Sequence, residues 1–192
     1  VSNVTWLGED DAIIAFDSGP GNALLDDWVF SHTGKRCDED GEIATRGVAD
    51  SEMVGAFLRA PYFLKDAPKS LDRNQFDEVL DKLSHLSLED GAATLTSMTA
   101  TSIALSFGAV PANPKQVLIC GGGRKNAYLM DLLKACVNAP VAPVEEVSWD
   151  GDMLEAQAFA YLAARSVQGF PLSLPTTTGV VQPVTGGVFY PV

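Results

Sequence analysis

The stretch Val117-Leu-Ile-Cys-Gly-Gly-Gly-Arg-Lys-Asn126 joins a short apolar run, three consecutive glycines and a helix-capping residue. The run from Val117 to Cys120 is typical of a buried β-strand. Asn126 is a good N-cap for the leucine-bearing segment that follows it. Because glycine has no Cβ atom, the backbone between them can turn sharply and come close to a ligand. We therefore predict a strand, a glycine turn and a helix.

A turn of this kind presents unpaired backbone N–H groups, which bind anions and nucleotides where a helix begins. However, Gly121, Gly122 and Gly123 form neither a G-x-G-x-x-G fingerprint nor a P-loop. Taken alone, the triplet fits a tight strand–helix turn that binds nothing just as well as it fits a nucleotide site.

A second stretch favours the ligand site. The segment Asp11–Phe16 has another buried-strand pattern, Asp17-Ser-Gly-Pro-Gly-Asn22 follows it directly, and Ala23–Phe30 has apolar residues at helical spacing. Open α/β sheets bind their ligands outside the carboxyl ends of strands. The sequence therefore predicts that Asp17 stands at a ligand site beside the glycine turn that contains Gly19 and Gly21.

The remaining patterns complete an α/β chain. Ser87 begins a segment that resembles a capping box, which predicts the start of a long helix. The other expected elements are a strand at 4–6, helices at 51–58, around 76–83, from 87 to about 107 and at 153–166, an extended segment at 141–147, and an extended, turn-rich tail from Pro171. This order predicts a mixed sheet flanked by helices.

Composition restricts the class of protein. A length of 192 residues suits one domain or one lobe of a two-lobed enzyme. The net charge of −12 argues against nucleic acids and anionic membranes as partners. No apolar run approaches the roughly 20 residues of a membrane span. The three cysteines, Cys37, Cys120 and Cys136, lack metal-ligand spacing, so we expect reduced thiols in a cytoplasmic protein.

Two enzyme classes fail on the residues present. Ser18 lacks the preceding glycine of a G-x-S-x-G nucleophile elbow, and the only histidines, His32 and His85, lie in polar helical stretches. A Ser-His-Asp hydrolase is therefore excluded. The same inventory excludes a zinc site, short of ligands scattered over distant segments.

Four motifs occur in the order Phe16-Asp-Ser-Gly-Pro-Gly-Asn22, Pro68-Lys-Ser70, Cys120-Gly-Gly-Gly123 with Asn126, and Glu155-Ala-Gln-Ala-Phe-Ala160. Together they resemble the C-terminal half of the anhydro-N-acetylmuramic acid kinase family, part of the actin-like (ribonuclease H-like), sugar-kinase-like ATPase superfamily. The resemblance runs from Val1 to the closing segment at 185–188. It implies that residues 1–192 form the C-terminal lobe of a two-lobed kinase, without the N-terminal lobe. Val1–Thr5 then looks like the tail of a Gly-Gly-x-x-Asn phosphate loop.

The resemblance also implies an activity. Family members use ATP and Mg²⁺ to open 1,6-anhydro-N-acetylmuramic acid hydrolytically and phosphorylate this amino sugar to N-acetylmuramic acid 6-phosphate, in peptidoglycan recycling. Asp17 would be the general base, and Glu155 would hold the sugar. The nucleotide residues would be Asn3, Gly19 and Gly21 near the phosphates, and Gly121, Gly122, Gly123 and Asn126 along the adenine and ribose. The sequence identifies no metal ligand.

The residues alone leave several alternatives open. Without the resemblance, Glu155 is explained by compensation of the helix dipole. Lys69 and Arg73 fit solvated loop charges as well as contacts to an anionic substrate or the other lobe, and this chain has Leu71-Asp72 where the family usually has Thr-Gly. A nucleotide-binding module without chemistry, a related kinase of different substrate and a homodimer are also open. A pure nucleotide sensor does not need Asp17, which favours the enzyme. We expect residues 1–192 alone to be inactive.

Overall fold

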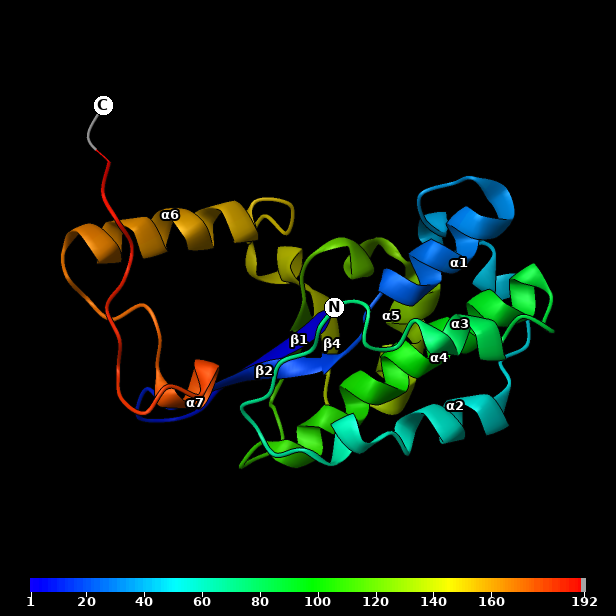
Figure 1. Ribbon diagram of the computed structural model, residues 1–192, viewed down its shortest axis with the longest axis horizontal. Helices are drawn as coiled ribbons and strands as arrows, with labels where there is room; N and C mark the ends of the chain where they lie inside the picture. The colour runs from blue at the N-terminus through cyan, green and yellow to red at the C-terminus, as the bar shows by residue number, and fades with distance from the viewer. Residues whose placement is uncertain (191–192) are drawn as a thin grey trace.

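The computed structural model describes residues 1–190 and has a mixed α/β architecture (Figure 1). The strands are β1 (Ser2–Leu7), β2 (Ile13–Gly19), β3 (Val117–Ile119) and β4 (Val141–Pro143). The helices are α1 (Ala23–Thr33), α2 (Ser51–Leu58), α3 (Glu78–Lys82), α4 (Leu88–Ser106), α5 (Ala127–Cys136), α6 (Leu154–Val167) and α7 (Pro175–Thr178). Short 3-10 turns, including Gly122–Lys125 and Val144–Val147, connect them.

The strands form two separate pairs, where the sequence predicts a single mixed sheet. β1 and β2 are antiparallel with Asn3 opposite Asp17, and β3 and β4 are parallel with Val117 opposite Val141. The outer edge of β2 is occupied, because the Asp17 N–H donates to the Lys69 carbonyl at 2.9 Å. Thus the predicted strands are present, but within residues 1–190 no hydrogen-bonded ladder joins the two pairs.

Local capping chemistry sets the helix boundaries as predicted. α1 ends at Gly34, which has the left-handed φ of 73° that glycine adopts readily. The Ser87 side chain accepts from the Asp90 N–H at the start of α4, and the Asn126 side chain accepts from the Leu129 N–H at the start of α5.

Three segments differ from expectation. The helix expected around 76–83 is reduced to α3, because the Asp72 carboxylate accepts from the Asn74 N–H and holds the preceding residues in turns. The segment 141–147 leaves the extended conformation after Pro143. The tail contains the short helix α7, with Pro175 in its first turn and Gly179 at its C-cap.

The core lies around α4, which packs against α1, α2 and α5. One buried cluster includes Leu24, Trp28, Leu83, Leu95 and Met98. A second cluster joins α4 to α5 and β4. The many Ala, Ser and Thr residues of α4 let these neighbours approach closely, and they support β2 from one face.

The helices α6 and α7 and the tail lie on the other side of the β1–β2 pair from α1–α4 (Figure 1). None of the residues of α6 is buried. Across residues 1–190, every helix is too short or too polar to cross a membrane.

Candidate functional site

Asp17 lies within β2, where the sequence predicts it just after the strand. Its backbone is held on both sides: its N–H donates to the Lys69 carbonyl at 2.9 Å, and the Tyr62 hydroxyl donates to its carbonyl at 2.7 Å. Its side chain is also oriented, because Oδ2 accepts from the Leu71 N–H at 2.7 Å. The carboxylate is therefore fixed on a rigid support.

The two carboxylate oxygens of Asp17 differ in their surroundings. Oδ2 is engaged by Leu71, whereas Oδ1 has no hydrogen-bond partner in the described part of the chain. Asn3 is exposed directly opposite on β1, and residues paired across two strands share a face. A fixed carboxylate with one free oxygen can accept a proton from water or from a substrate hydroxyl.

The loop from Pro68 to Arg73 has a clear structural role. It runs along β2 and supplies both the Lys69 carbonyl and the Leu71 N–H that hold Asp17. Lys69 Nζ donates to the Lys65 carbonyl and lies 4.9 Å from the centre of the Tyr62 ring. Burial lowers the pKa of Lys69, and Arg73 pairs with Asp27 at 2.8 Å. Both loop charges thus have partners within this chain.

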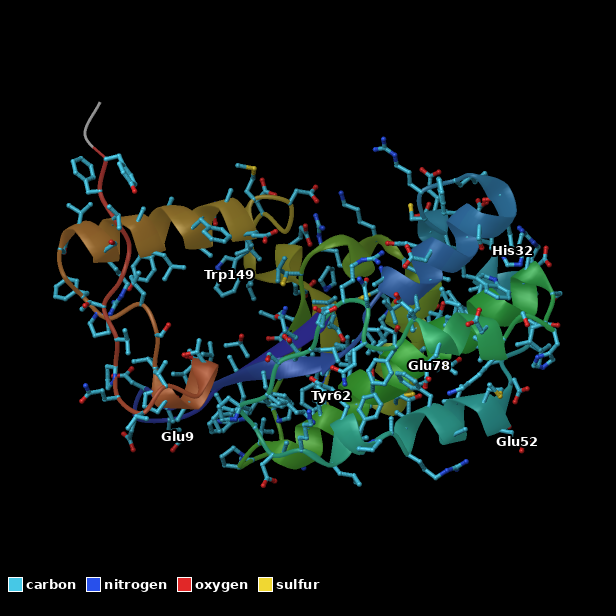
Figure 2. The ribbon with its side chains drawn as sticks, in the orientation of Figure 1. Glu9, His32, Glu52, Tyr62, Glu78 and Trp149 are labelled. Atoms are coloured by element: carbon cyan, nitrogen blue, oxygen red, sulfur yellow. The ribbon has the colours of Figure 1, made fainter. Side chains whose placement is uncertain are left out.

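Tyr62 is a site residue that the sequence analysis missed. Burial, with a smaller contribution from the Asp17 charge, raises the pKa of Tyr62 from 10.0 to about 12. Its hydroxyl is consequently a permanent donor to the Asp17 backbone at ordinary pH. Figure 2 shows it between the β2 strand and α4. No sequence motif marks this contact, because the two residues come from segments 45 positions apart.

Gly19 and Gly21 are required by packing. Gly21 has a φ of 60°, and a Cβ there would lie 2.7 Å from the Ser2 nitrogen. A Cβ at Gly19 would lie 2.6 Å from Ser102 Oγ on α4. The Thr99 hydroxyl also donates to the Gly21 carbonyl at 2.7 Å, which fixes the turn onto α4. Their contact with nucleotide phosphates stays a prediction, as does that of Asn3.

The second glycine turn is open where a ligand could approach. Gly121 has φ 69° and ψ −169°, a conformation almost restricted to glycine. A Cβ on Gly121 or Gly122 would meet no atom within 4 Å. The N–H groups of Gly122 and Gly123 have no acceptor in the described part of the chain. The turn therefore has two backbone donors without an acceptor among residues 1–190.

The structure confirms that Asn126 caps α5. Its side chain lies against Gly41, and the residue is only 5% exposed. Its contact with nucleotide stays a prediction.

Glu155 lies exposed in the first turn of α6, and within residues 1–190 no hydrogen bond or ion pair joins it to another side chain. Trp149, which is half-exposed, lies in the segment just before α6 (Figure 2). The structure thus brings together Asp17 and Asn3, while Glu155 stands apart on α6.

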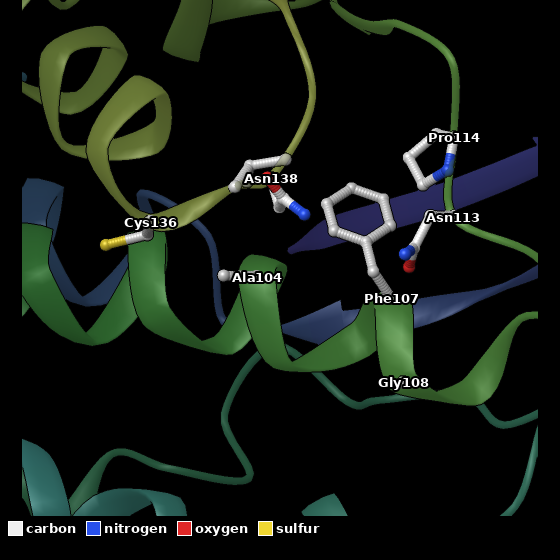
Figure 3. A pocket seen from close by; sticks show the side chains of 8 residues that line it. Ala104, Phe107, Gly108, Asn113, Pro114, Cys136 and Asn138 are labelled. Carbon is white, nitrogen blue, oxygen red and sulfur yellow. The ribbon is translucent and has the colours of Figure 1, made fainter.

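Two cavities of the described chain are lined by other residues than the predicted site residues. One, of about 230 Å³, lies between the end of α4 and the end of α5 and is bordered by Phe107, Asn113 and Asn138 (Figure 3). The other, of about 310 Å³, includes Ser18 and Lys69, on the face of β2 opposite to Asp17. Neither of these two cavities is lined by Asp17 or by the Gly121–Gly123 turn.

Metal ligands are not assembled in residues 1–190, because no group of three or more His, Cys, Asp or Glu side chains is placed to hold an ion. The three cysteines are free and exposed.

Comparison with known proteins matches these features to one family. The family model of anhydro-N-acetylmuramic acid kinase matches residues 1–192. Proteins of that name from Rhodospirillum rubrum, Paramagnetospirillum magneticum and Acidiphilium cryptum are 51%, 50% and 50% identical to this chain, of which they cover 100%, 97% and 97%. The chain spans about half the length of these curated relatives, 51% to 53%. The resemblance of the motifs to this family is confirmed, and the assignment to its C-terminal lobe stays a prediction.

Proposed function

The chain belongs to the anhydro-N-acetylmuramic acid kinase family, and from this we propose that it is the C-terminal lobe of a two-lobed sugar kinase. The complete protein would act in the cytoplasm, in peptidoglycan recycling. It would convert 1,6-anhydro-N-acetylmuramic acid, ATP and water to N-acetylmuramic acid 6-phosphate and ADP. Support comes from the match over residues 1–192 and from the placement of Asp17.

The proposed reaction must solve one chemical problem. The O6 atom of the sugar, which is to receive the phosphoryl group, is bound to the anomeric carbon C1 in the anhydro bridge. Water attacks C1, the C1–O6 bond breaks, and the proton of the water passes to Asp17. O6 then attacks the γ-phosphorus of ATP, and ADP leaves. General-base catalysis of this kind typically contributes about 10²–10⁴-fold to the rate.

The observation that carries the proposal is the asymmetry of the Asp17 carboxylate. Leu71 holds Oδ2, while Oδ1 remains free on the face that Asn3 shares. The Leu71 N–H orients the carboxylate of Asp17 through one oxygen only. The contacts of the Asp17 backbone with Tyr62 and Lys69 hold this part of β2 in place. A carboxylate so placed can keep one oxygen aimed at a water molecule.

The other assignments follow the family. The free N–H groups of Gly122 and Gly123 would donate to oxygen atoms of the nucleotide. Glu155 would hold the sugar, which requires the complete protein to bring α6 and Asp17 to one substrate. Mg²⁺ would accompany ATP and neutralise its phosphates. We assign no Mg²⁺ ligand within residues 1–190, because the carboxylates described there form no such group.

The test is Asp17→Asn in the complete protein. The amide keeps the size of the side chain and its acceptor for Leu71, but it cannot take up a proton. We expect ATP affinity to be nearly unchanged and kcat to fall by at least about 10²-fold. Single-turnover kinetics and thermal melting on one preparation distinguish this from a structural role. A lower melting temperature with normal turnover per folded molecule would remove Asp17 from the mechanism.

A further inference from the structure

We propose that Arg124 is the positioning residue of the nucleotide site, and that it also ties the glycine turn to the segment that begins α6. The inference rests on the proposed function, because it concerns how the same site is held. It comes from the surroundings of one side chain that the family motif leaves out: Arg124 follows directly on Gly121–Gly123.

The guanidinium of Arg124 joins three separate segments. Nε donates to Glu145 Oε1 at 2.8 Å, Nη1 donates to the Gly121 carbonyl at 2.8 Å, and Nη2 lies 3.0 Å from Asp152 Oδ1. The Arg124 side chain is only 6% exposed. The guanidinium also lies close against Gly151, because a Cβ at that position would collide with it. We call this set of contacts, between Arg124 and Glu145, Asp152 and the Gly121 carbonyl, the Arg124 clamp.

The Arg124 guanidinium uses three of its five N–H donors on two carboxylates and a carbonyl, and the carboxylates offset its positive charge. The hydrogen bond to Glu145 raises the pKa of Arg124, and the one from Arg124 lowers the pKa of Glu145. The pKa of Asp152 is lowered by Lys125 and then by Arg124. The charges of Arg124, Glu145 and Asp152 are thus paired with one another, as expected if Arg124 acts through these neighbours.

The clamp determines where the turn points its donors. The peptide bond between Gly121 and Gly122 is trans, so its C=O and N–H point in opposite directions. Because Arg124 holds the Gly121 carbonyl, the Gly122 N–H is aimed away from the guanidinium, and it has no acceptor in the described part of the chain. A free glycine triplet would sample many conformations, so this restraint removes an entropic cost of binding.

The same clamp reaches the sugar side. Asp152 lies three residues before Glu155, and Glu145 also accepts from the Gly151 N–H at 3.3 Å. Arg124 therefore connects the turn proposed for the nucleotide with the N-terminal end of the helix proposed for the sugar. Loosening it should weaken the binding of both substrates.

The experiment uses the complete protein and the variants Arg124→Met and Lys125→Met. Lys125 is the matched control, because it is the adjacent cation and pairs with Asp152 at 2.9 Å but does not contact the turn carbonyl. Calorimetry with a non-hydrolysable ATP analogue gives nucleotide affinity, and steady-state kinetics separates KM for the sugar from kcat. We expect Arg124→Met to weaken analogue binding by at least about tenfold and to raise KM for the sugar, with a smaller change in kcat. Lys125→Met should leave both near the wild-type values.

The outcomes separate the two proposals. If the wild-type protein neither binds the analogue nor turns over, the proposed function fails. If it does both and Arg124→Met binds the analogue equally well, the positioning role is overturned and Arg124 is only structural. Should Arg124→Met not fold, Glu145→Gln decides the question, since it keeps the shape of the clamp and weakens its charge pairing. That variant must weaken analogue binding, by a smaller factor, or the inference is wrong.

Discussion

The openness of Gly122 makes it the most informative position at which to test nucleotide binding. In the structure a Cβ on Gly122 would meet no atom within 4 Å, so Gly122→Val adds a side chain without a clash inside this chain. Its φ is also outside the left-handed range, unlike that of Gly121. The added isopropyl group would occupy the space from which a ligand must approach the turn.

The expected magnitudes follow from these contacts. Stability should stay within about 1 kcal/mol of wild type, because the substitution neither strains the backbone nor displaces neighbours. Nucleotide affinity should fall, because the valine keeps the ligand from the free N–H groups of Gly122 and Gly123. Two hydrogen bonds at about 0.5–1.5 kcal/mol each correspond to about 1–3 kcal/mol, or roughly 5–150-fold in Kd.

Calorimetry with ATP and urea unfolding on the complete protein measure both quantities. Gly121→Ala is the contrasting variant: its φ of 69° and ψ of −169° should make the substitution cost about 1–3 kcal/mol of stability. If Gly122→Val bound ATP as tightly as the wild type, the turn would be only a structural connection between β3 and α5. The assignment of the nucleotide site to it would then be refuted.

Two further predictions concern Asp26 and the chain by itself. Burial, and then the charge of Asp27, raise the pKa of Asp26 from 3.8 to about 6. Because ionised Asp26 is less favourable in the folded state than in the unfolded chain, the folded state is destabilised as the pH rises from 3.8 toward 6, and it is not destabilised below pH 3.8. Asp26→Asn should therefore stabilise the protein above pH 6 and not below pH 3.8, measured by urea unfolding at both ends. The shift corresponds to about 3 kcal/mol, which partial exposure to solvent reduces to about 1 kcal/mol, and an equal effect at both ends would contradict the argument. Residues 1–192 alone should show no ATP-dependent phosphorylation of the anhydro sugar, and robust turnover would remove the need for a second lobe.

The sequence predicts those features of the fold that depend on nearby residues. The end of α1 at Gly34 and the starts of α4 and α5 at Ser87 and Asn126 are correct, because a cap is formed within three or four residues of the chain. The strands β1 and β2 and their turn follow equally from local pattern. Strand pairing does not, because the segment that occupies the edge of β2 comes from the distant loop at Lys69.

The candidate site divides in the same way. Residue type and position in a motif pointed to Asp17 and to the glycines, but the reasons for two of those glycines lie in packing against other elements. Gly19 gives room to Ser102, and Gly21 gives room to Ser2. Arg124 directly follows the glycine triplet, but nothing in the neighbouring sequence indicates its role. Its importance depends on Glu145 and Asp152, which only the folded chain brings to it.

The loop at 68–73 shows why a departure from a motif need not disturb the site. Its contributions to Asp17 are the Lys69 carbonyl and the Leu71 N–H, which are backbone groups that almost any residue supplies. The Leu71 side chain instead packs into the buried cluster that contains Trp28 and Met98, and this packing anchors the loop. Leu71 therefore supplies the same backbone donor as the threonine that the motif resemblance implies there, and only the packing of the side chain differs. Backbone contacts leave no trace in side-chain identity, so the sequence could raise the question of this loop but could not answer it.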